Sequence, residues 1–219
     1  MTENGCVIIR RSPIWYRPDS TSMPHLRLQL AMVLATIVMF ALTLAANGWL
    51  FPQLELIPGI NWIYLPAGVR LVATLLFGGA GAVGLLIVSW LVCFLYLFPD
   101  DFSRAFMGGI LATVAPYLVY KLAQHWFGLR ASLANLTPKR LLACIVAYSV
   151  ASPLLHHIWF YLHGGADHVV QSFFVMFIGD LSGTLIVIYT IKGLLALMPR
   201  RPTTDARCTF PEQSAGHRN

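Results

Sequence analysis

Long apolar runs recur along the whole chain, and only short polar breaks separate them. Most of the runs approach or exceed the ~20 residues that a helix needs to cross a bilayer. Charged residues make up 11% of the sequence, whereas soluble domains contain about 25%. The sequence therefore predicts an all-α fold, a polytopic transmembrane helix bundle in one compact domain, with the lipid bilayer as its surroundings.

Proline, glycine and polar clusters divide the apolar sequence into six predicted spans. The first run, from Leu28 to Leu50, is too long for the apolar part of a signal peptide, which has about 7–15 residues. We expect a cytosolic lead at 1–25, the transmembrane domain at 26–198 and a disordered cytosolic tail at 199–219. The expected spans are 28–50, 61–78, 82–98, 102–122, 140–161 and 169–198.

Basic residues are distributed unevenly between the loops that six spans would create. With a cytosolic N-terminus, thirteen Lys and Arg residues fall on the cytosolic side and only Arg104 falls outside. This asymmetry is the positive-inside bias of membrane proteins, so both termini are expected in the cytosol. Orientation in the membrane thus accounts for the net charge of +6, and no nucleic-acid partner is expected.

One arginine lies inside the second predicted span. Pro66 favours a helix start there, and Arg70 follows one turn later on the same face. Burying this charge costs at least ~2.5–3.5 kcal/mol, so Arg70 should face protein or a wet cavity. Asp180 is the only other charge deep in a span, and the helical rise places the two residues at similar depths, about 13 Å and about 16 Å below the outer boundary. We expect either a structural ion pair of Arg70 with Asp180, or a site for a ligand or coupling ion.

Two glycine patterns occur in the predicted spans. Gly179 and Gly183 form G-x-x-x-G in the last span. Residues this small let helix backbones approach closely, so the pattern predicts packing within the chain, a homodimer face or space for a ligand. Gly79, Gly81 and Gly84 spell a dinucleotide fingerprint, but they join two predicted transmembrane helices and no strand precedes them. We interpret them as a tight turn and expect no cofactor.

Potential metal ligands gather near the outer end of the fifth span, at His156, His163, Asp167 and His168. His156 and His163 are seven residues apart and share a helix face. Imidazole and carboxylate groups can bind zinc or copper, but histidines there also suit the interfacial belt of a membrane protein, and we expect no metal. The four cysteines show no paired spacing, so no disulfide framework or zinc site is expected.

Two segments resemble a known family. LPAGVRLVATLLFG at 65–78 and IGDLSGTLIV at 178–187 are similar to two motifs of the MASE-type integral membrane sensor domains of the first class. The matching residues are Pro66, Ala67, Gly68 and Gly78 in the first motif, and Gly179, Asp180 and Gly183 in the second. The resemblance implies a bacterial inner-membrane sensor module that binds a small molecule and signals through a partner, such as a histidine kinase or a diguanylate cyclase.

Two other functions are open at this point. The size and the six-span topology are similar to those of the substrate-binding components of energy-coupling factor transporters, which implies capture of a small solute and a transporter subunit as partner. The third alternative is a structural or assembly protein whose buried charges only stabilise it. An enzyme is not expected, because no span combines a nucleophile with a base at helical spacing.

Overall fold

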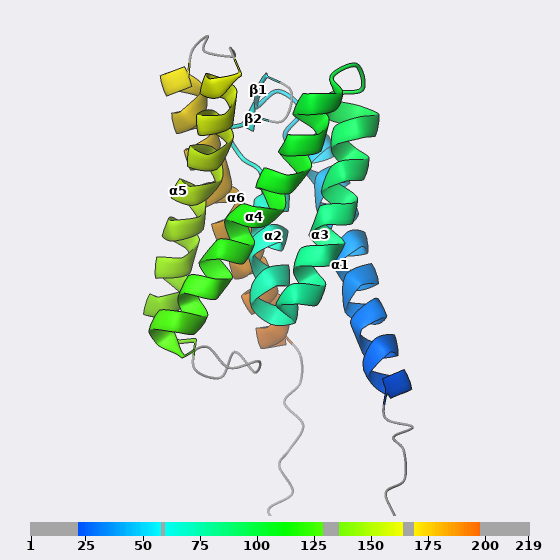
Figure 1. Ribbon diagram of the computed structural model, residues 1–219. Coiled ribbons are helices and arrows are strands. Elements are labelled where there is room, and N and C mark those ends of the chain that lie inside the picture. The colour runs from blue at the N-terminus through cyan, green and yellow to red at the C-terminus, as the bar shows by residue number, and fades with distance from the viewer. Residues whose placement is uncertain (1–21, 58–59, 129–135, 164–168, 198–219) are drawn as a thin grey trace, which may run out of the picture.

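The computed structural model describes residues 22–57, 60–128, 136–163 and 169–197. Within these ranges the protein is an all-α bundle with one small two-stranded sheet (Figure 1). A π-helical turn (Cys93–Leu97) extends the third helix, and strands β1 (Glu55–Ile57) and β2 (Ile60–Asn61) pair antiparallel. The helices are α1 (Ser22–Leu50), α2 (Leu65–Phe77), α3 (Gly79–Val92), α4 (Phe102–Phe127), α5 (Pro138–Leu162) and α6 (Val169–Leu197).

In the described part of the chain, five helices are long and apolar enough to cross a membrane: α1, α4, α5, α6, and α3 together with its π-helical turn. These five helices overlap five of the predicted spans, and the arrangement is that of a multi-pass membrane protein. The predicted span 61–78 is helical only from Leu65 to Phe77, and this helix begins next to Pro66, where the sequence favoured a helix start. Its 13 residues extend about 20 Å, which is less than the ~30 Å of a bilayer core. Pro66 lies in the first turn of α2, where the missing N–H costs nothing.

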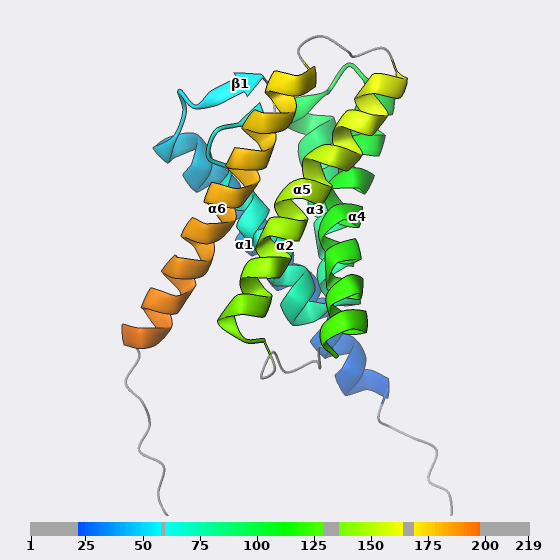
Figure 2. The ribbon, with the colours of Figure 1, turned by 90° about the vertical axis from the view of Figure 1, so that its left-hand side faces the viewer.

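The short helix α2 occupies the middle of the bundle (Figures 1 and 2). It contacts α1, α3, α4 and α6, and ten of its thirteen residues are buried. By comparison, only 11% of the apolar window of α1 is buried. A side chain on almost any face of α2 therefore meets protein, so the central position explains how this span accommodates an arginine.

The first turn of α1 and the last turn of α6 lie at the same end of the bundle (Figures 1 and 2). The opposite end carries β1 and β2, the connection from α3 to α4, the last turn of α5 and the first turn of α6. We call this opposite end the sheet end.

Residues 61–64 lead from β2 into α2 without forming a helix, and we call them the 61–64 segment. Asn61 and Tyr64 at its two ends are buried. The Tyr64 N–H donates to the Gly179 carbonyl oxygen of α6 at 3.2 Å. The Leu65 N–H donates to the Asn47 side-chain oxygen of α1 at 2.9 Å. Non-helical backbone at membrane depth is tolerated only where protein supplies such partners. The neighbouring helices α1 and α6 thus stabilise the start of α2.

Glycines let the 61–64 segment lie directly on α6. A Cβ atom at Gly179 would collide with the Asn61 carbonyl oxygen, and a Cβ atom at Gly183 would collide with the Tyr64 carbonyl oxygen. The G-x-x-x-G face is therefore covered within the chain, by non-helical backbone and not by another helix. Of the three uses that the sequence suggested for this pattern, packing within the chain is the one that the structure contains.

Candidate functional site

Arg70 lies on α2 with its side chain directed toward the start of the helix, as helix geometry favours. One guanidinium nitrogen, Nη2, donates to the Tyr64 hydroxyl at 3.4 Å. The guanidinium carbon lies 5.3 Å from the centre of the Phe40 ring of α1 and 5.2 Å from the centre of the Tyr64 ring. Cation–π contacts of this kind are worth about 0.5–2 kcal/mol. The charge is therefore held mainly by aromatic rings and hydroxyl groups.

The ion pair between Arg70 and Asp180 that the sequence suggested is not formed. Asp180 is 1% exposed on α6, but among the described residues only Arg104 and Asp101 approach within salt-bridge distance. The register of α2 on α6 explains the gap. Gly183, only three residues after Asp180, already contacts Tyr64, six residues before Arg70.

The predicted depths applied the helical rise of about 1.5 Å per residue from residue 61 onward. The helix α2 begins only at Leu65, and the chain bends at Trp62 and Ile63 before it. A helical rise therefore does not describe residues 61–64, and depth counted from residue numbers does not decide whether the two side chains meet.

Polar side chains of α5 extend the surroundings of these two charges. Tyr148, Ser152 and His156 are spaced four residues apart, so they share one helix face, and all three are buried. Arg70 interacts electrostatically with Tyr148, Asp180 and His156, and the Ser152 side chain interacts with the Asp180 carboxyl group. We call these five residues together with Tyr64 the Arg70 cluster.

Several buried atoms of the Arg70 cluster have no hydrogen-bond partner of good geometry: Arg70 Nε, Tyr148 OH, Ser152 Oγ and Asp180 Oδ2. Each such atom costs about 1–3 kcal/mol, and folded proteins leave few of them. Their concentration around two separated charges is typical of a functional site more than of a structural ion pair. No carboxylate of the described residues lies within salt-bridge distance of the guanidinium, so it could bind an anion directly, and the hydroxyl groups could donate to the same group.

The α5 face is the part of this cluster that the sequence analysis missed. Its signal was present, because Tyr148, Ser152 and His156 interrupt an apolar span at intervals of four residues. Polar residues at this spacing in a transmembrane helix point toward one neighbour.

A cavity of about 380 Å³ lies at the sheet end, between α1, the end of α3 and the 61–64 segment. Its polar lining includes Asn47, Glu55, Asn61, Tyr64 and Tyr96. Tyr64 is shared, because its ring lines the cavity and its hydroxyl accepts from Arg70. The cavity therefore reaches the Arg70 cluster at Tyr64, whose side chain lies between the cavity and the Arg70 guanidinium.

The histidines of α5 lie in different surroundings. His156 is buried in the Arg70 cluster, where its Nδ1 lies 2.8 Å from the Ser152 carbonyl oxygen. His163 is exposed at the end of α5, and Asp167 and His168 lie outside the described residues. The part of the chain that the structure describes contains no group of three residues able to hold a metal ion.

The remaining motif residues serve the packing of α2. Pro66 is fully buried in its first turn. A Cβ atom at Gly68 would lie 2.6 Å from the Val187 Cβ of α6, so glycine sets the close approach of these helices. Gly78 ends α2 with φ of 55°, a conformation that glycine adopts readily, and α3 begins at the next residue. The prediction of a tight turn at Gly79, Gly81 and Gly84 is wrong, because all three lie within α3, and the turn consists of Gly78 alone.

Comparison of the chain with family models, curated proteins and solved structures returns no significant match. The resemblance to the MASE-type sensor domains therefore rests on the two sequence motifs, which the structure brings together where α2 packs on α6.

Proposed function

We propose that the protein is a sensor-like module of the bacterial inner membrane that binds a small organic anion at the Arg70 cluster and signals through a partner protein. The observation that carries this proposal is the state of the Arg70 guanidinium, which is 8% exposed and has no carboxylate within salt-bridge distance. A buried cation without a counter-charge is costly. An anionic ligand would supply the missing charge.

Binding at this cluster would act on three helices at once, because its residues come from α2, α5 and α6. A ligand shifts a conformational equilibrium by its difference in affinity for the two states. An anion that draws Arg70, Tyr148 and Asp180 into a new arrangement would change how α6 packs on α2. The end of α6, opposite the sheet end (Figure 2), would carry that change toward a histidine kinase or cyclase partner.

The cavity at the sheet end provides the approach for the ligand. The positive-inside bias places this end outside the cytosol, with six crossings and both termini in the cytosol. The first turn of α1 and the last turn of α6 lie at the same end of the bundle (Figure 1), which fits this even number of crossings. Rotation of the Tyr64 side chain would connect the cavity with the guanidinium.

A transport component is the second candidate, and the broken second span favours it. Transporters place substrate sites at discontinuous helices whose half-helix N-termini face anionic groups. The short helix α2 likewise begins at buried residues within the bundle, with strand β2 in the place of a first half-helix. Uptake by proteoliposomes that contain the protein and an ATPase partner would favour transport, whereas binding without uptake would favour sensing.

Small molecules retained by the purified protein test the proposal. The wild type, Arg70→Gln and Arg104→Gln would be isolated in lipid nanodiscs from a bacterial host, denatured and extracted for mass spectrometry. Arg104 is the matched control, because it is 43% exposed and lies 3.6 Å from Asp101. We expect one organic anion in the wild type and in Arg104→Gln, and its loss in Arg70→Gln. Retention of the same anions by all three proteins would contradict the proposal.

A further inference from the structure

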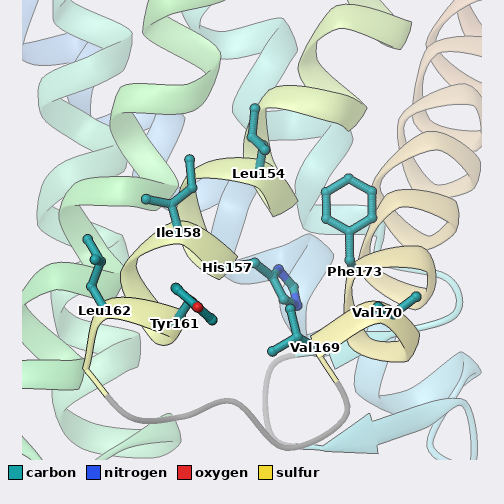
Figure 3. A pocket seen from close by; sticks show the side chains of 8 residues that line it. All are labelled: Leu154, His157, Ile158, Tyr161, Leu162, Val169, Val170 and Phe173. Atoms are coloured by element: carbon teal, nitrogen blue, oxygen red, sulfur yellow. The ribbon is translucent and has the colours of Figure 1, made fainter.

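A groove of about 370 Å³ lies between the last turns of α5 and the first turns of α6 (Figure 3). Ile158 and Leu162 of α5 and Val170 of α6 line it, and each is between 49% and 71% exposed. The groove therefore opens toward the surface that an apolar bilayer would cover. None of the described residues that line it is Asp, Glu, Lys or Arg.

His157 is the exception in this apolar wall. Its ring extends from α5 toward Val169 and Phe173 of α6 (Figure 3), and the side chain is 6% exposed. Its Nδ1 lies 2.8 Å from the Pro153 carbonyl oxygen, so Nδ1 carries the proton of a neutral ring and Nε2 is an acceptor. Nε2 is buried and has no hydrogen-bond partner.

We propose that this groove binds a lipid-soluble phenol, whose hydroxyl donates to His157 Nε2. Because none of the described lining residues is Asp, Glu, Lys or Arg, the charge of a lipid headgroup would lack a partner in the groove. A lipid with a charged headgroup is therefore not the preferred occupant. The free acceptor requires a donor, which a phenol supplies and an ester or ether does not. The rings of His157 and Phe173, whose centres are 5.7 Å apart, favour an aromatic occupant.

Binding requires a small local movement. His157 Nε2 is buried in this structure, and the Val169 side chain lies beside the imidazole ring (Figure 3). A shift of that side chain would open the acceptor to the groove. The site is separate from the Arg70 cluster, so the two proposals stand or fall independently.

A matched pair of ligands tests the hydroxyl directly. Equilibrium binding of para-decylphenol and of its methyl ether, para-decylanisole, would be measured with the wild type in nanodiscs. The two probes have similar apolar surfaces, but only the phenol donates a hydrogen bond. We expect the phenol to bind about tenfold more tightly, the value of one hydrogen bond. Equal affinities would overturn the proposal.

Two variants then assign the preference to His157. His157→Phe keeps an aromatic ring of similar size and removes the acceptor, so the preference for the phenol should vanish. Tyr189→Phe changes an exposed tyrosine of α6 that does not line the groove and should leave the preference intact. A preference that survives in His157→Phe would overturn the assignment, and the comparison of the two probes on the wild type remains decisive if that variant fails to fold.

Discussion

Replacement of Gly183 by alanine tests the packing that positions the Arg70 cluster. The new methyl group would collide with the Tyr64 carbonyl oxygen and lie 2.9 Å from the Leu65 nitrogen. These are backbone atoms, and hydrogen bonds to Asn47 and Gly179 hold them in place, so they cannot swing aside. Overpacking of this kind costs about 1–3 kcal/mol, and the better helix propensity of alanine returns about 0.5–1 kcal/mol. We expect a net loss of about 1–2 kcal/mol in the free energy of unfolding.

Gly193→Ala is the matched control on the same helix. Its Cβ would have no neighbour within 4 Å, so stability should stay unchanged or rise by up to about 1 kcal/mol. Both variants would be compared with the wild type by reversible denaturation in one detergent. If Gly183→Ala proves as stable as Gly193→Ala, then α6 does not lie against the 61–64 segment as described.

Two further predictions concern the start of α2 and the topology. Asn47→Ala removes the acceptor of the Leu65 N–H and should cost about 1–2 kcal/mol of unfolding free energy, whereas Asn47→Asp retains an acceptor and should cost less when both are measured by denaturation. For topology, Lys139 lies in the first turn of α5 and His163 directly follows its last turn, and both residues are exposed. In intact cells, a cysteine at Lys139 should be protected from an impermeant thiol reagent, and a cysteine at His163 should be labelled. Labelling of the cysteine at Lys139 from outside would show that the orientation is the opposite one.

Hydropathy and helix breakers predicted the bundle and most of its helices. The burial of Arg70 also followed from the sequence, because the cost of a charge in lipid leaves few alternatives. The sequence did not predict the non-helical 61–64 segment, because its stability comes from hydrogen bonds with α1 and α6 and not from its own residues. The hydropathy of an apolar run does not reveal hydrogen bonds to residues distant in the sequence.

The alternatives for Arg70 and Asp180 stayed open in the sequence for the same reason. Depth along a helix can be counted from residue numbers, but only while the chain stays helical, and residues 61–64 are not helical. The contribution of α5 was missed for another reason, because hydropathy says nothing about which helices are neighbours. The polar face at Tyr148, Ser152 and His156 gains meaning only once α5 is placed beside α6.

The unfolding free energy of Arg70→Gln tests whether Arg70 is kept for a ligand or for the stability of the fold. If Arg70 is kept for a ligand, it is a buried charge without a counter-ion in the empty protein, and a neutral amide removes that cost. The loss of cation–π contacts offsets part of the gain. We expect the unfolding free energy of ligand-free Arg70→Gln to lie within about 1 kcal/mol of the wild-type value, or above it. A loss of about 3–5 kcal/mol, the cost of breaking a buried ion pair, would contradict it and identify Arg70 as a structural residue.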